Sequence, residues 1–92
     1  MPVAVVGTIP GMTVKQYDEI MEDVSDHMMD KAHMHFMHKH GDGLRMVEIW
    51  PDQEHLDEFM GMVQPWMAKF NLTPEIEVVP VHNHFHKHKA HK

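Results

Sequence analysis

Residues 33–50, HMHFMHKHGDGLRMVEIW, contain two extended-type segments joined by Gly41-Asp42-Gly43. Segment 44–50 is rich in β-branched and aromatic residues, and segment 33–40 alternates histidine with methionine or phenylalanine over most of its length. A short connection that contains two glycines is typical of a tight turn between antiparallel strands. The stretch therefore predicts a β-hairpin.

The residues before this hairpin predict one strand and one helix. A β-branched run from Val3 to Ile9 ends at Pro10-Gly11, which favours a strand followed by a turn. Thr13 and Gln16 then form a Thr-x-x-Gln capping box. Apolar residues recur after it at spacings of three and four, so a helix is expected from about 14 to 31.

The residues after the hairpin predict a second helix and a last strand. Pro51 and Asp52 end the preceding strand, and Asp52 is suited to cap a helix whose apolar stripe includes Leu56, Phe59 and Val63. Pro65 is expected to kink that helix or to restart it. Residues 75–81 are β-branched, and Pro80 favours a position at the edge of the sheet or a bulge.

The element order is therefore βαββαβ, and 92 residues allow one domain. The simplest arrangement is an α+β, ferredoxin-like antiparallel sheet of four strands with both helices on one face. A second copy of the chain is the expected cover for the other face, which predicts a homodimer. We assign residues 1–82 to this domain and residues 83–92 to a His-rich tail or strand extension.

Several short motifs resemble one superfamily. They are Gly11-Met12-Thr13 with Tyr17, the segment Gly43-Leu44-Arg45-Met46-Val47-Glu48-Ile49-Trp50, Gln53-Glu54 with Phe59, and Pro80-Val81-His82-Asn83. Over residues 2–83 they resemble small stand-alone members of the dimeric α+β barrel superfamily, related to antibiotic-biosynthesis monooxygenase domains. The resemblance implies two sheets packed face to face and a pocket between helices and sheet in each subunit. Some members oxidise polyketides without a cofactor, and others bind and degrade haem.

Composition excludes several classes of function. The formal charge of −6 provides no basic field for nucleic acid or an anionic membrane surface. The absence of cysteine excludes thiolate metal sites and thiol catalysis. No signal peptide or membrane span is recognised, so a cytoplasmic location is expected. No serine or other nucleophile is paired with a base, and the sequence assigns no catalytic and no cofactor-binding residue.

Histidine and methionine are more abundant than folding requires. Ten of the eleven histidines fall in residues 27–40 and 82–91. Imidazole binds copper, nickel and zinc, whereas the methionine thioether selects soft ions such as Cu(I). We therefore predict a transition-metal site, with copper ahead of nickel and zinc. The candidate ligands are His27, His33, His35, His38, His40, His82, His84, His86, His88, Met28, Met34 and Met37.

The predicted strands suggest how these ligands could meet. Alternation along a strand puts His33, His35 and Met37 on one face and Met34, Phe36, His38 and His40 on the other. If the last strand of one subunit runs beside the second strand of its partner, the two His-rich segments meet across the dimer. Asp23, His27 and Asp30 share one face of the first helix and could add a carboxylate-histidine pair.

Simpler explanations exist for the same residues. Met21, Met60, Met62 and Met67 fit helical core packing, and the tail histidines could be a solvated tail or a purification tag. Three functions therefore remain open. They are a metal buffer, chaperone or sensor, a small monooxygenase-like or haem-handling enzyme that uses the pocket, and a structural dimer without chemistry.

Overall fold

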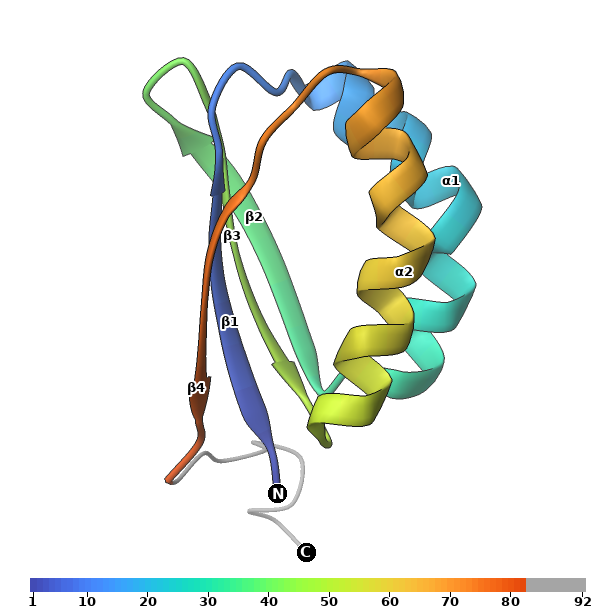
Figure 1. Ribbon diagram of the computed structural model, residues 1–92, viewed down its shortest axis with the longest axis vertical. Helices are drawn as coiled ribbons and strands as arrows, with labels where there is room; N and C mark the ends of the chain where they lie inside the picture. The colour runs from blue at the N-terminus through green and yellow to red at the C-terminus, as the bar shows by residue number, and fades with distance from the viewer. Residues whose placement is uncertain (83–92) are drawn as a thin grey trace, which may run out of the picture.

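The computed structural model describes residues 1–82 and contains four strands and two helices (Figure 1). In chain order they are β1 (Val3–Ile9), α1 (Val14–Lys31), β2 (Met34–His40), β3 (Gly43–Trp50), α2 (Gln53–Lys69) and β4 (Glu75–Pro80). The βαββαβ order and the α+β class expected from the sequence are confirmed, with boundaries that agree to within one or two residues.

The strands form one antiparallel sheet in the order β2-β3-β1-β4. The hairpin strands β2 and β3 are paired from Met34↔Ile49 to His40↔Gly43. The position of β4 at an edge confirms the expectation from Pro80, because a proline has no N–H to give to a further strand. The strands β2 and β4 therefore form the two opposite edges of the sheet.

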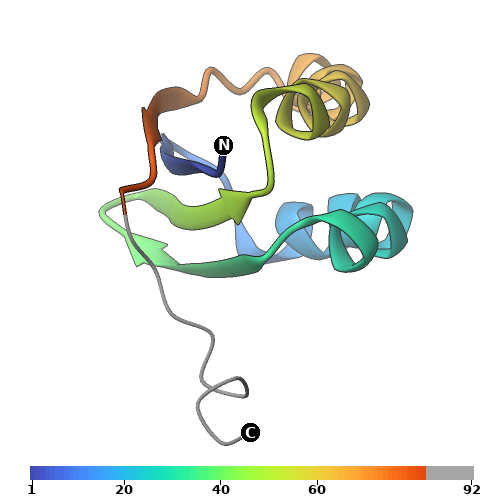
Figure 2. The same ribbon diagram turned by 90° about the horizontal axis from the view of Figure 1, so that it is seen from below.

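Both helices cover the same face of the sheet, as Figures 1 and 2 show. Alternation in β1 turns Val3, Val5 and Ile9 toward the helices, and all three are buried. On α1 the buried residues Ile20, Val24 and Met28 recur every fourth position. Trp50 is the largest of the fully buried side chains, and its ring centroid lies 4.9 Å from that of Phe59 on α2.

Local sequence signals fix the ends of the elements. Thr13 and Gln16 form both hydrogen bonds of the capping box, and Asp52 caps α2 by accepting from the backbone N–H of His55 at 2.8 Å. Gly43 is required by close packing, since a Cβ there would lie 2.1 Å from the carbonyl oxygen of Ile9. The turn of the hairpin thus rests directly against the end of β1.

Pro65 does not divide the second helix. The expectation of a restart at this residue is wrong, because α2 continues through Pro65 to Lys69. The missing N–H of Pro65 leaves the carbonyl of Gly61 without its usual helical donor, but the helix is held on both sides of this point by packing. Leu56 and Phe59 are buried before it, and Met67 is buried after it.

The opposite face of the sheet is covered by no residue in the 1–82 range. The strand registers place its outward side chains in rows across the sheet: Met34, Ile49, Ala4 and Val79, then Phe36, Val47, Val6 and Glu77, then His38, Arg45, Thr8 and Glu75. We call this surface the open face. Of these side chains, Phe36 is 49% exposed and Val79 is 39% exposed. Neither of the two helices is long and apolar enough to cross a membrane.

Candidate functional site

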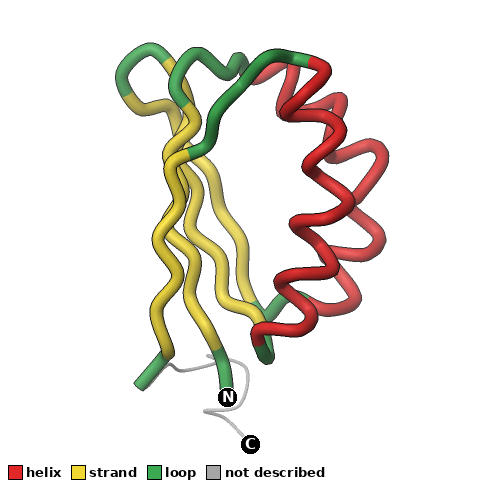
Figure 3. The backbone as a smooth tube through the Cα atoms, in the orientation of Figure 1, coloured by secondary structure: helices red, strands yellow, loops and turns green. Residues whose placement is uncertain are grey.

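A cavity of about 450 Å³ lies between the sheet and the helices. Its wall is mainly apolar and is contributed by every described element. Val5 and Ile9 come from β1, Met46 from β3, Phe59 and Val63 from α2. The connection from α2 to β4, drawn in green in Figure 3, crosses from the helix layer to the sheet and adds Leu72, Thr73 and Pro74 to the wall. A volume of this size suits a small organic molecule.

Three polar side chains on the cavity wall form a hydrogen-bonded chain. The hydroxyl oxygen of Tyr17 lies 2.6 Å from Nε2 of His35, and Nδ1 of His35 lies 2.9 Å from Oε2 of Glu48. Trp50 donates its indole N–H to the other carboxylate oxygen of Glu48 at 2.8 Å. We call Tyr17, His35 and Glu48 the polar triad.

Local structure explains how these side chains meet. His35 and Glu48 are cross-strand partners in the β2-β3 register, and both face the helices. Tyr17 lies in the second turn of α1, where its ring stacks over the imidazole of His35 with centroids 6.0 Å apart. The capping box at Thr13 fixes the start of α1, so the position of Tyr17 above the sheet is set by the helix start.

With Glu48 ionised and His35 neutral, the hydrogen bonds have one consistent direction of donation. A carboxylate has only acceptor oxygens, so Glu48 accepts one hydrogen bond from Trp50 Nε1 and another from His35 Nδ1. His35 Nε2 then carries a lone pair and accepts from the hydroxyl of Tyr17. This assignment is inferred from the network. In this arrangement a buried carboxylate holds the tautomer of His35, and Nε2 is the nitrogen that can act as a base.

The environment also changes the acidity of Tyr17. Burial raises the pKa of Tyr17 above its ordinary value, and the nearby charges of Glu48 and Asp18 raise it further. The phenol therefore stays protonated and can donate a hydrogen bond. Glu48 is itself 2% exposed, so its carboxylate depends on His35 and Trp50 for the hydrogen bonds that water would otherwise supply.

The polar triad was not identified as a site from the sequence. His35 was predicted only as a metal ligand, and both of its ring nitrogens have hydrogen-bond partners, Tyr17 and Glu48. One signal was available in β3, where Leu44, Met46, Glu48 and Trp50 alternate onto the inner face. A carboxylate in an otherwise apolar inward row is unusual, and it indicates a buried polar network.

The predicted metal ligands are spread over several places. His38 and His40 lie on the open face of β2, with ring centroids 6.1 Å apart. Met37 is partly buried and packs against the core. His82 follows β4 at the opposite edge of the sheet, and His84, His86 and His88 lie outside the described residues. Within residues 1–82 no three His, Asp or Glu side chains are grouped so that they could hold a metal ion.

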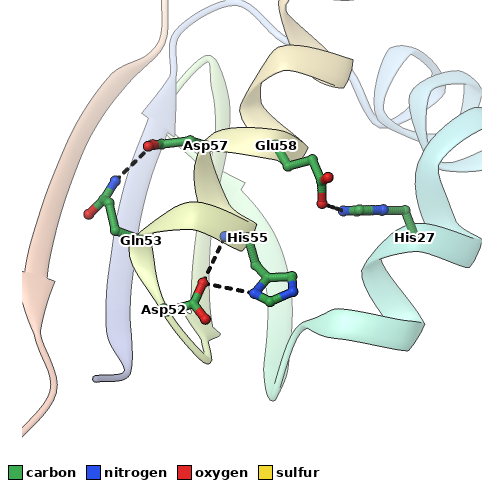
Figure 4. A network of polar contacts seen from close by, with 6 residues as sticks. All are labelled: His27, Asp52, Gln53, His55, Asp57 and Glu58. Carbon is green, nitrogen blue, oxygen red and sulfur yellow. Dashed lines mark hydrogen bonds and ion pairs between the residues drawn. The ribbon is translucent and has the colours of Figure 1, made fainter.

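His27 lies between the two helices and the sheet. Its ring is 6.3 Å from Trp50 and 6.4 Å from Phe59, and its Nε2 lies 3.6 Å from Oε1 of Glu58 on α2 (Figure 4). The carboxylate expected beside it, Asp23, instead accepts from the indole N–H of Trp66 at 2.9 Å. Both residues therefore connect α1 with α2.

Four other candidate ligands come together at the edge of the sheet. Met28, His33, Met34 and His35 line a second hollow, together with Met21 and Met29. The sequence placed His33 and His35 on one strand face and Met34 on the other. They share a hollow because β2 is an edge strand that starts immediately after α1 ends.

Comparison with known proteins supports the fold. No protein family's model matches the chain, and no curated protein sequence matches it. Solved structures do match. A protein of unknown function from Nitrosomonas europaea has a TM-score of 0.63 and 13% identity, with 92% of this chain and 94% of that one covered. The fold is ferredoxin-like.

Two further structures have the same fold but different descriptions. A candidate antibiotic biosynthesis monooxygenase from Chloroflexus aurantiacus has a TM-score of 0.54 and 18% identity, with 90% of this chain and 97% of that one covered. The periplasmic divalent cation tolerance protein CutA from Archaeoglobus fulgidus has a TM-score of 0.56 and 11% identity, with 94% and 90% covered. The expected likeness to monooxygenase-type α+β structures is confirmed at the level of fold. Such different descriptions on one fold leave the activity to be argued from the side chains.

Proposed function

We propose that the cavity binds a small, mainly apolar molecule with one ionisable hydroxyl or enolisable carbonyl, and that the polar triad moves a proton to or from it. The observation that carries this proposal is the Tyr17–His35–Glu48 chain on the wall of a 450 Å³ apolar cavity. A base oriented by a buried carboxylate is the arrangement that general acid-base catalysis uses.

The triad has a defined role for each residue. The Tyr17 oxygen accepts the proton of the ligand while the Tyr17 hydroxyl proton passes to His35, so the phenol is neutral again after the transfer. His35 Nε2 takes the proton, and Glu48 stabilises the imidazolium that forms, because its oxygen lies 2.9 Å from Nδ1. The proton thus remains in a buried site, where the opposite charge of Glu48 offsets the cost of the new cation. Proton abstraction from a phenol or an enolisable carbon is the simplest reaction that this geometry supports.

A small organic ligand is favoured over haem. A haem ligated by His35 would have to displace either Tyr17 or Glu48 from the imidazole, since both ring nitrogens are hydrogen-bonded. Removal of the Glu48 contact would leave a buried carboxylate with one partner fewer. A monooxygenase-like reaction, in which dioxygen attacks a deprotonated aromatic ligand, is compatible with the triad and needs no haem.

Binding is tested with 2-naphthol, which is apolar and carries one ionisable hydroxyl, against naphthalene, which lacks it. Calorimetry should show that 2-naphthol binds more tightly and that Tyr17→Phe removes most of the difference. His38→Gln, on the open face, is the control and should bind as the wild type does. Equal binding of the two probes, unaffected by Tyr17→Phe, would show that the cavity has no polar recognition.

Proton transfer is tested with 2-tetralone in deuterated water, where NMR follows exchange of the C–H beside the carbonyl. The protein should accelerate exchange above the buffer rate, and His35→Gln should abolish the acceleration while 2-naphthol binding persists. Exchange at the buffer rate in the wild-type protein would reduce the site to a binding pocket. A Soret band on adding haem, lost in His35→Gln, would overturn the choice of a small organic ligand.

Metal binding on β2 is a second candidate function. His38 Nδ1 donates to the carbonyl of Lys39 at 2.8 Å, so its Nε2 presents the lone pair, and His40 lies beside it. We propose that these imidazoles bind Cu(II), Ni(II) or Zn(II), and that tail histidines supply further ligands. β2 and β4 are at opposite edges of the sheet, and we propose that a site joining β2 to the carboxy-terminal end forms across a dimer.

This second candidate predicts a defined stoichiometry. Native mass spectrometry with Cu(II) should show a fixed number of ions per dimer, which falls in His38→Gln/His40→Gln and after deletion of residues 84–92. Removal of His55, which pairs with Asp52 at the start of α2, is the control and should leave the number unchanged. Binding that is weak, non-stoichiometric and equal in all three proteins would contradict it.

The open face is the proposed site of homodimerisation. Its apolar rows are uncovered in the part of the chain that the structure describes, and its two edges differ in charge. His38 and Arg45 lie toward the β2 edge, whereas Glu75 and Glu77 lie on β4. A two-fold arrangement with β4 of the partner against β2 would bring opposite charges together while it buries the apolar rows.

A further inference from the structure

The second hollow is rich in methionine. Its volume is about 360 Å³, and four of the eleven methionines line it: Met21, Met28, Met29 and Met34. Ser25, Ala32, His33 and His35 complete the wall. Three of these methionines lie in the last three turns of α1, and the fourth, Met34, belongs to the outward row of the sheet and lines the hollow from the edge strand β2.

The four methionines differ in burial. Met28 is 6% exposed and belongs to the core, whereas Met29 is 81% exposed and Met34 is only partly buried. The lining of the hollow therefore includes both a buried methionine and an exposed one.

We propose that this hollow is a binding site for a soft monovalent metal ion, Cu(I), with the methionine thioethers as ligands. Thioether sulfur is a neutral, polarisable donor that selects Cu(I) over Ni(II) or Zn(II). A monovalent ion also loses less hydration free energy than a divalent ion when it enters a site without carboxylates. This inference shares with the proposed β2 site only the idea that the protein binds a transition metal. It uses methionine thioethers in place of histidine imidazoles, and Cu(I) in place of Cu(II).

The charges around the hollow contribute little to the choice of ion. α1 ends at Lys31, next to the hollow, and the carboxy-terminal end of a helix carries a partial negative charge. That effect is worth under about 1 kcal/mol at an exposed helix end, and Lys31 itself opposes it. The affinity must therefore come from the sulfur atoms.

His35 is not a ligand in this site. Its two nitrogens belong to the polar triad, although its ring forms part of the wall of both cavities. Met21 likewise lines both. An ion held by Met21 would therefore lie next to the triad without displacing any of its hydrogen bonds.

The test uses the full-length chain, labelled with ¹³C at the methionine methyl groups and titrated with Ag(I), a redox-inert analogue of Cu(I). One equivalent should shift the methyl resonances of Met21, Met28, Met29 and Met34. Met60 and Met67, which line the larger cavity, are internal controls and should not move. Equal shifts at all the methionines, or none at the four, would overturn the proposal.

A matched pair of variants separates sulfur from shape. Met29→Leu/Met34→Leu conserves apolar volume but removes two thioethers, and it should lose binding of the first equivalent of Ag(I), and of Cu(I) under anaerobic conditions. Met46→Leu/Met60→Leu removes two thioethers from the other cavity and should bind as the wild type does. Thermal unfolding confirms that both are folded. Retained binding in the first variant would refute the site.

The result is independent of the imidazole site on β2. His38→Gln/His40→Gln should lose Cu(II) and keep Ag(I), whereas the Met29 and Met34 variant should do the reverse. Loss of Ag(I) from the histidine variant would show that the soft ion binds at the imidazoles instead, and would overturn the methionine site.

Discussion

At the scale of single residues, Glu48 determines the character of the cavity. It is 2% exposed, and it accepts hydrogen bonds from both His35 and Trp50. A buried carboxylate with two donors is stable only while both remain in place. Glu48 thereby fixes the position and tautomer of His35, and through it the direction of the Tyr17 hydroxyl.

The chain contains a single tyrosine, so the acidity of Tyr17 can be measured directly. Absorbance of the tyrosinate ion should titrate with a midpoint above the ordinary tyrosine pKa, because burial and the charges of Glu48 and Asp18 disfavour the anion. Glu48→Gln should lower the midpoint while leaving it above the ordinary value, since burial is the largest cause. Asp18→Asn should lower it less.

The raised pKa of Tyr17 also makes the free energy of unfolding depend on pH. The contribution of the neutral phenol to this free energy is fully present below the ordinary tyrosine pKa and is lost as pH rises through the higher pKa of the folded state. Tyr17→Phe should therefore lose less stability than the wild type over that alkaline range. A midpoint at or below the ordinary value would contradict the buried environment assigned to this phenol.

Replacement of Glu48 should destabilise the protein. Glu48→Leu leaves His35 Nδ1 and Trp50 Nε1 without an acceptor, and each buried donor costs roughly 1–3 kcal/mol. We expect a net loss of about 2–4 kcal/mol, because removal of the buried charge offsets part of the cost. Glu48→Gln should lose less, since its carbonyl oxygen satisfies one donor.

Denaturant unfolding at fixed protein concentration measures these changes. Glu19→Gln, at an exposed position on α1, is the control and should change stability by under about 0.5 kcal/mol. A Glu48→Leu variant as stable as the wild type would show that the carboxylate is dispensable for folding.

At the scale of elements, the two helices begin with different caps, and this difference has a pH dependence. The backbone N–H and the ring of His55, both hydrogen-bonded to Asp52, hold the pKa of that carboxyl below its ordinary value of 3.8. Thr13 caps α1 with a hydroxyl that does not titrate in this range.

The two caps predict different effects of acid on stability. Asp52→Ala should lower stability at neutral pH, and the deficit relative to the wild type should shrink as pH falls below 3.8 and through the lower folded pKa. Thr13→Ala should cost about 1 kcal/mol at every pH, because its hydrogen bond involves no titrating group. Urea unfolding over a pH series distinguishes the two. A constant Asp52→Ala deficit would exclude a contribution from the ionised carboxylate.

Pro65 shows how packing overrides a local signal. A proline in a helix costs about 3 kcal/mol in an isolated segment, which is why a restart was expected there. In the folded chain α2 is held by Leu56, Phe59 and Met67 against the sheet, and Trp66 donates to Asp23 of α1. Tertiary contacts on both sides of the proline keep the helix continuous.

At the scale of the whole molecule, the open face is the surface through which we propose that the chain dimerises. We predict that the wild-type chain is a homodimer and that Phe36→Lys/Val79→Lys is a monomer, because two cations would be buried among apolar rows. Sedimentation velocity measures both masses. Val14→Lys is the control, since Val14 is 41% exposed on α1 and should tolerate lysine without any change of mass.

The charge arrangement allows a second test of the same interface. Arg45→Glu should weaken the dimer, and adding Glu77→Arg should restore it, because the charges across the interface then differ again in sign. A wild-type chain that sediments as a monomer, or a double lysine variant that remains a dimer, would contradict this assembly.

The local sequence was sufficient to determine the elements and their order. Period-two and period-four patterns, the capping box at Thr13, the cap at Asp52 and the glycine turn are signals over a few residues, and each produced the element expected. Pro80 likewise indicated an edge strand, because a proline has no backbone N–H to donate to a second neighbouring strand.

Only the tertiary structure decided the site. Tyr17, His35 and Glu48 are separated by 18 and 13 positions, and their contact depends on the β2-β3 register and on the angle of α1 over the sheet. The same geometry brings Met21, Met28, Met29 and Met34 to one hollow and separates them from His38 and His40. Composition identified which chemical groups are abundant, but distances across strands and helices determine which of them can act together.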